Sequence, residues 1–122
     1  MDDPQYTHLA YYQRLVVQIK QQILQGVLMP DDKLPSVRDM AKQMQLNPNT
    51  VAKAYKQLES EQVIYVKPGQ GSFVRAATPP DDAMVRNLQA RFKTVVVSAL
   101  SAGVTEVELQ QWLQDAAKGG AL

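Results

Sequence analysis

Amide, hydroxyl and basic side chains recur between residues 34 and 60 at spacings that suit contact with DNA. Asn and Gln can pair with adenine edges, Thr can touch a thymine methyl, and Lys and Arg neutralise phosphates. The candidates in this stretch are Ser36, Arg38, Lys42, Asn47, Pro48, Asn49, Thr50, Lys53 and Lys56. Polar side chains also cover the solvent face of ordinary helices, which is the commoner situation for one helix taken alone. The elements that position these residues therefore decide the interpretation.

Two short helices joined by a tight turn are predicted around these candidates. Ser36 begins the first, because its hydroxyl can accept from a free backbone amide and Asp39 completes an S-x-x-D pattern. Asn47 caps the second, with Pro48 at the first helical position, where a missing N–H has no cost. Apolar residues at helical spacing give the two helices inward faces: Val37, Met40, Ala41 and Met44, then Val51, Ala54, Tyr55 and Leu58. This layout is typical of a helix-turn-helix that reads DNA.

A β-hairpin is predicted directly after the second helix. In residues 63–75, VIYVKPGQGSFVR, two β-prone segments flank a turn rich in Pro and Gly. Most such hairpins are purely structural, but this one follows a helix-turn-helix, where a winged helix has its wing. Gly69, Gln70 and Gly71 are further candidates, because main-chain amides without a nearby Cβ can approach phosphate or a minor groove.

Four ordered segments within residues 12–74 resemble one known family. They are QGVL at 25–28, KLPSVRDMA at 33–41, NPNTVAKAY at 47–55 and GQGSFV at 69–74. Together they look like the DNA-binding domain of the GntR transcription regulators, and within them the short YtrA-type subfamily. The resemblance implies DNA contacts by Ser36 and Arg38, by residues 47–53, and by residues 69–71.

The chain departs from the family pattern at three places. Asp31 stands where glycine is usual, so we expect a locally different turn. Gln62 stands where glycine commonly ends the recognition helix in a left-handed conformation, which predicts a strained residue or an altered turn. The tip, Pro68 to Gln70, lacks the basic residues often found there, which leaves Lys67 and Arg75 as flanking phosphate contacts.

A helix ending at Gly26 is expected to pack behind the other two, and a helical tail is expected after the wing. Residues 76–82, with Pro79-Pro80, read as a linker between a domain at 1–77 and a tail at 83–122. Helices are predicted from about Ala83 and from Thr105, which forms a T-x-x-E capping box with Glu108. The apolar residues assigned to dimerisation are Val85, Leu88, Phe92, Val95, Val96, Ala99, Leu109, Trp112 and Leu113.

Two amphipathic helices of this length cannot form an independent core, so the tail needs a partner. A second copy would give a two-fold dimer, with its recognition helices about one helical turn, or a multiple, apart on a palindromic operator. The alternative is that the tail packs on its own winged domain.

Composition narrows the function classes further. The net charge is only +1, from 13 basic and 12 acidic residues, so DNA binding would depend on where the charges lie. There is no cysteine and a single histidine, His8, so we expect no disulfide, metal site or cofactor. No motif of an enzyme active site occurs, and no apolar run is long enough for a bilayer. We therefore expect a cytoplasmic protein without enzymatic activity.

The sequence thus predicts a mainly α fold with a small β-hairpin: a winged helix-turn-helix domain followed by a two-helix dimerisation tail. The predicted function is a bacterial, sequence-specific transcription regulator, with repression assigned by family analogy. Its expected partners are double-stranded DNA, a second copy of itself and a small-molecule effector of unknown identity, held between helices or at the dimer interface. The alternative is a winged-helix module that binds a protein instead of DNA.

Overall fold

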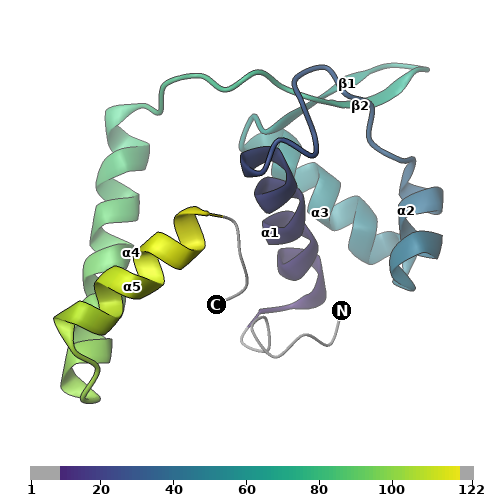
Figure 1. Cartoon of the computed structure of the whole chain (residues 1–122). Helices are drawn as coiled ribbons and strands as arrows, with labels where there is room; N and C mark the ends of the chain where they lie inside the picture. Colours follow the sequence, from purple (N-terminus) through teal and green to yellow (C-terminus); the bar gives the residue numbers. More distant parts are fainter. Residues whose placement is uncertain (1–8, 119–122) are drawn as a thin grey trace. The chain divides into compact units, whose positions relative to one another are not determined.

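The computed structural model describes residues 9–118, which form five helices and one two-stranded sheet (Figure 1). His8 and the outer ends of both predicted domains lie outside the described residues. The chain divides into two compact units between Ala77 and Thr78. The elements are α1 (Tyr11–Leu24), α2 (Val37–Met44), α3 (Pro48–Ser60), β1 (Ile64–Lys67), β2 (Gly71–Val74), α4 (Asp82–Ser101) and α5 (Glu106–Ala117). This order confirms the predicted mainly α fold with a small hairpin.

The first unit is built around α3, which contacts α1, α2 and β1. The predicted inward face of α3 is confirmed, because Val51, Ala54, Tyr55 and Leu58 are all buried. On α1 the structure buries Leu15, Val16 and Ile19, so this helix packs behind the other two as expected. The buried core of this unit is Leu15, Val16, Ile19, Leu34, Met40, Ala41, Val51, Ala54, Tyr55, Leu58, Ile64 and Val74.

The caps of the two central helices form as predicted. The Ser36 hydroxyl accepts a hydrogen bond from the Asp39 amide at 3.1 Å. The Asn47 side-chain oxygen accepts from the Asn49 amide at 2.8 Å, and Pro48 is the first residue of α3. Each cap satisfies a backbone donor that a helix start would leave without a partner.

Four helices end in a left-handed turn, two of them at glycine and two at glutamine. Gly26 follows α1 and Gly103 follows α4, whereas Gln45 follows α2 with φ 55° and Gln62 follows α3 with φ 60°. After α3, the Val63 amide donates to the Leu58 carbonyl at 2.9 Å, closing the turn typical of a Schellman motif. The predicted strain at residue 62 is thus confirmed, since a side chain crowds the backbone in this region.

The wing pairs β1 with β2 in antiparallel register, with Tyr65 opposite Phe73. The segment before α2 lies along the outer edge of β2 through an antiparallel bridge between Lys33 and Phe73. Asp31 takes a left-handed φ of 69°, so the expected local turn is present. The Tyr65 hydroxyl donates to the Asp31 carboxylate at 2.6 Å, and this bond raises the pKa of Tyr65.

The second unit consists of α4 and α5. Helix α4 begins at Asp82, one residue before the predicted start, because the Asp81 carboxylate in the expected linker accepts from the Met84 amide at 2.7 Å. The predicted capping box of Thr105 and Glu108 is confirmed at the start of α5. No helix within residues 9–118 is both long and apolar enough to cross a membrane.

Candidate nucleic-acid interface

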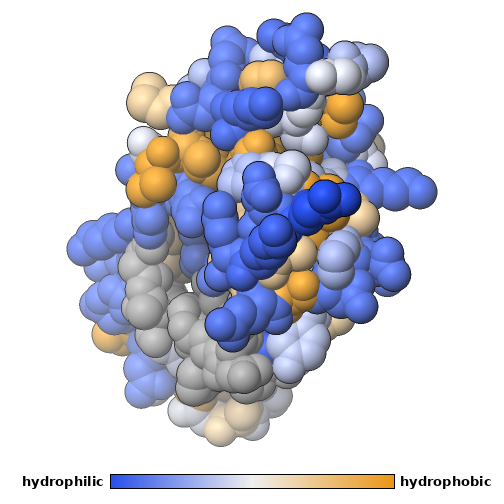
Figure 2. All heavy atoms as spheres, turned by 90° about the vertical axis from the view of Figure 1, so that its right-hand side faces the viewer, coloured by the Kyte–Doolittle hydropathy of each residue, from blue (hydrophilic) through white to orange (hydrophobic). Residues whose placement is uncertain are grey.

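The start of α2, the outer face of α3 and the wing carry the predicted contact residues. Arg38 and Lys42 are exposed on α2, and Asn49 and Lys56 are exposed on α3. The side of the molecule on which α2 and the hairpin tip lie in Figure 1 is covered mainly by hydrophilic residues (Figure 2). An open groove between α2 and the wing is lined in part by Ser36, Gln70 and Gly71, so these predicted residues come together.

Three exposed residues of α3 share one face of the helix. Asn49, Ala52 and Lys56 are all exposed and follow one another at helical spacing. Ala52 was not among the predicted contacts, yet a small apolar side chain on this face can meet a thymine methyl. Thr50, at the edge, is partly buried.

Lys53 takes a position that the helical pattern alone did not indicate. Its ammonium lies 4.2 Å from the centre of the Tyr12 ring on α1, a cation–π contact. The predicted outer stripe of α3 is therefore not uniform. Lys53 bends toward α1, whereas Asn49 and Lys56 have no such contact among the described residues.

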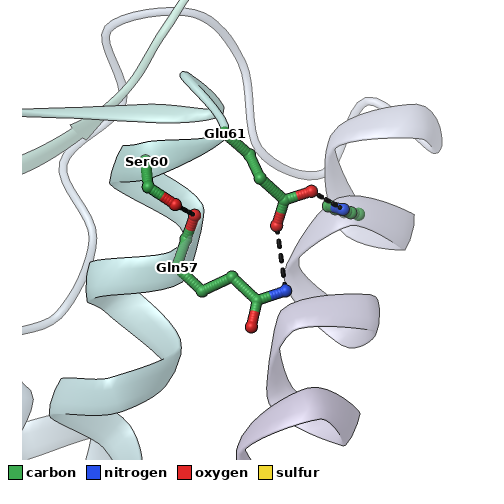
Figure 3. A network of polar contacts seen from close by, with 4 residues as sticks. Gln57, Ser60 and Glu61 are labelled. Atoms are coloured by element: carbon green, nitrogen blue, oxygen red, sulfur yellow. Dashed lines mark hydrogen bonds and ion pairs between the residues drawn. The ribbon is translucent and has the colours of Figure 1, made fainter. Parts of the chain in front are cut away.

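The C-terminal half of α3 is tied to α1 by a polar network (Figure 3). Glu61 accepts from the Lys20 ammonium at 2.8 Å and from the Gln57 amide at 3.0 Å. The Ser60 hydroxyl donates to the Gln57 carbonyl at 2.8 Å. The pair of Lys20 and Glu61 is partly exposed and adds little stability, but it occupies the polar groups at this end of the helix. Gln57 and Glu61 are thus engaged within the winged unit, unlike Asn49 and Lys56 on the outer face.

A buried hydroxyl joins α3 to the start of α2. Tyr55 donates to the Pro35 carbonyl at 2.7 Å, immediately before the capping residue Ser36. Burial raises the pKa of Tyr55 to about 12, so this hydroxyl stays a donor at neutral pH. The bond fixes the position of the start of α2, and with it Ser36 and Arg38, relative to α3, the recognition helix.

The wing has an exposed tip and a basic, aromatic outer face. Gly69 and Gly71 have φ of 77° and 126°, which a side chain would strain. Tyr65 and Phe73 stack with ring centres 5.6 Å apart. The Lys67 ammonium lies 4.8 Å from the Phe73 ring centre, and the Arg75 guanidinium lies 5.5 Å from that of Tyr65. Both flanking cations thus lie over this aromatic pair.

The residues assigned to dimerisation remain largely uncovered in the single chain. Phe92 and Val95 are 62% and 61% exposed, and Leu88 and Leu113 are also more than half exposed. Trp112 is exposed as well, whereas Val85, Val96, Ala99 and Leu109 are partly buried. Sequence reasoning did not assign four further exposed apolar residues of this unit: Met84, Val97, Leu100 and Val107.

Three packed helices and a hairpin, with an exposed polar face on the third helix, define a winged helix-turn-helix protein. Residues 11–74 match the family model described as bacterial regulatory proteins, gntR family. The chain belongs to this family, as the resemblance predicted.

Relatives extend the similarity to the tail. The chain is 36% identical over 114 residues to the HTH-type transcriptional repressor YtrA of Bacillus subtilis (strain 168), covering 89% of this chain and 88% of that protein. This relationship confirms the YtrA-type subfamily. A solved structure described as a transcriptional antiterminator from Listeria monocytogenes EGD-e matches with a TM-score of 0.88 and 28% identity, covering 100% of this chain and 93% of that one.

About half of the chain matches a protein solved with DNA. The DNA-binding domain of AraR, in complex with operator ORX1, is 32% identical and matches with a TM-score of 0.52, covering 54% of this chain and 80% of that one.

Proposed function

We propose that this protein is a sequence-specific DNA-binding transcription regulator that represses by occupying an operator. The observation that carries the proposal is the grouping of exposed Arg38, Lys42, Asn49 and Lys56 on two packed helices of a unit with its own buried core. The AraR DNA-binding domain, which matches 54% of this chain, was solved in complex with an operator. Repression is supported by the description of the YtrA relative as a repressor.

In this mechanism the N-terminal half of α3 enters the major groove. Asn49 can make paired hydrogen bonds to an adenine edge, and the Ala52 methyl can contact a thymine methyl. Lys56 and Arg38 neutralise phosphates on either side and fix the orientation of the helix without reading sequence. Asn47 uses its side-chain oxygen for capping, so its NH₂ group remains to donate to DNA.

We infer that two copies act together through the tail. Phe92, Val95 and Leu88 lie on one face of α4 and are more than half exposed, and the tail has no residue classed as buried among those described. Burial of this apolar area by a second copy would lower the free energy of the pair. A two-fold pair would place two recognition helices on a palindromic operator.

The remaining expectations follow from this role. A small-molecule effector would bind in the tail, where Leu88, Phe92 and Val95 line an open apolar hollow on α4. A regulator of this kind works in the cytoplasm and needs no catalytic group.

The test is selection of bound fragments from random duplex DNA by the full-length protein. An enriched palindrome is the expected result. Arg38→Ala should then weaken binding of the selected fragment, whereas Arg86→Ala, the same change on the exposed side of α4, should leave it unchanged. No enrichment, or equal binding by both variants and the wild type, would favour the winged-helix module that binds a protein.

A further inference from the structure

The tip of the wing carries no charge of its own. Pro68, Gly69 and Gln70 are all exposed, and none of them can neutralise a phosphate. The nearest cation within the hairpin, Lys67, lies over the Phe73 ring on the outer face. A wing that approaches a DNA backbone gains most of its affinity from cations, so a missing charge at the tip calls for another source.

Lys33 is placed beside this tip by backbone pairing. It forms an antiparallel bridge with Phe73, next to the β2 edge. On either side of it, the Leu34 amide donates to the Ser72 carbonyl at 2.8 Å, and the Val74 amide donates to the Asp32 carbonyl at 2.9 Å. Lys33 therefore lies beside the wing, although 30 or more residues separate it from the wing in the sequence.

The side chain of Lys33 runs across Gly71. A Cβ on Gly71 would lie 3.0 Å from the Lys33 Cε and 3.8 Å from its Nζ. Glycine thus leaves the space through which the lysine reaches the base of the tip. The first of these distances is shorter than ordinary van der Waals contact, so a side chain at position 71 would displace the lysine.

The ammonium of Lys33 borders the open groove between α2 and the wing. Ser36, Gln70 and Ser72 line the same groove and offer hydroxyl and amide groups, and Asp39 is its acidic member. Lys33 is exposed and makes no ion pair with any residue of the described chain. Its charge is therefore available to an anion that enters the groove.

We propose that Lys33 supplies the wing with the cation that its tip lacks, and contacts a backbone phosphate of bound DNA. This inference rests on the proposed function, because it assigns one phosphate contact within that interface. Sequence reasoning did not select Lys33, since it precedes the helix-turn-helix and only the bridge to β2 brings it to the wing.

The experiment compares the full-length wild type with Lys33→Met, which keeps the aliphatic stem over Gly71 and removes only the charge. Binding is measured by fluorescence anisotropy against salt concentration, on the selected fragment and on a duplex of mixed sequence. A lost phosphate contact lowers the slope of log affinity against log salt by about 0.9. We expect that decrease on both duplexes, because a phosphate contact carries no sequence information.

Two matched variants separate charge from structure. Lys33→Arg should restore the wild-type slope, and Lys93→Met, the same loss of charge on α4, should not change it. An unchanged slope in Lys33→Met, together with weakened binding by Arg38→Ala, would overturn the role of Lys33 and leave the proposed function standing. If the wild type bound neither duplex in a salt-dependent way, both proposals would be overturned.

Discussion

The winged unit and the tail are both largely helical, but their apolar side chains have different surroundings. In the winged unit Leu15, Ile19 and Leu58 are at most 1% exposed, whereas in the tail Phe92 and Val95 are more than 60% exposed. Burial of apolar area is the main favourable term in folding. The winged unit has a buried core of its own, whereas no described residue of the tail is buried, so we expect the tail to be stabilised by association.

The largest effect should follow from placing a charge on the uncovered face of the tail. Phe92→Asp puts a carboxylate where a second copy would bury an aromatic ring, and an unpaired buried charge is strongly disfavoured. Loss of the dimer would leave each winged unit to bind its half-site separately. Affinity for the selected operator should fall by about 10²–10⁴-fold, the gain that linked sites usually provide. Sedimentation velocity and DNA titration measure the two changes.

Asn87→Asp is the control for this experiment. It adds the same charge to an exposed polar position of α4, so assembly and affinity should stay at wild-type levels. If Phe92→Asp stayed in the wild-type assembly state, the tail would not associate through this face, and the difference between the two regions would need another explanation.

A smaller effect should come from the same truncation made once in each region. Leu58→Ala empties a site that is 0% exposed and should lower the free energy of unfolding of the winged unit by about 2–5 kcal/mol. Leu88→Ala removes a half-exposed side chain, so its effect should depend on protein concentration. Far-ultraviolet circular dichroism follows overall unfolding, and Trp112, the single tryptophan, reports the tail by fluorescence. Equal, concentration-independent losses would show that the tail is packed within its own chain.

The parts of this fold that local chemistry decides could be predicted from the sequence. The caps at Ser36 and Asn47 and the inward face of α3 depend on residues within one or two turns of each other. The strain at Gln62 was predictable because a left-handed helix end favours glycine.

The contacts that sequence reasoning missed join segments distant along the chain. Lys53 lies over Tyr12, and Lys33 lies beside Gly71. Both depend on how α1 and the segment before α2 pack, which periodicity within one helix does not specify. A long basic side chain can reach in several directions from one backbone position. Helical periodicity therefore predicts the position of its Cα atom better than the position of its charged group.

A further test concerns the Tyr55 hydroxyl, whose removal should have an effect of about 1 kcal/mol at neutral pH. Tyr55→Phe leaves the ring in the core and deprives the Pro35 carbonyl of its partner. Because burial raises the pKa of Tyr55 from 10.0 to about 12, the folded state holds this proton more tightly than the unfolded state. Stability from this group is complete below pH 10 and is lost as pH rises toward 12.

The two proteins should therefore approach equal stability at alkaline pH, measured by urea unfolding across that range. None of the five tyrosines lies in the tail, so Trp112 emission should show no such difference. A constant difference between wild type and Tyr55→Phe from pH 8 to about 12 would contradict the assigned cause of the pKa shift.

The smallest effect should come from exchanging residues at equivalent helix ends of the two regions. Gln62 ends α3 at φ 60°, and Gly103 ends α4 at φ 99° with open space where a Cβ would stand. Gln62→Gly should raise the stability of the winged unit by about 0.5–1 kcal/mol, because relief of the left-handed strain exceeds the entropy that glycine adds to the unfolded chain. Gly103→Gln should lower the stability of the tail, measured by Trp112 fluorescence. Gln62 is exposed and Gly103 faces open space, so both changes should act through the backbone. A destabilised Gln62→Gly would mean that this glutamine makes a compensating contact in the assembled protein.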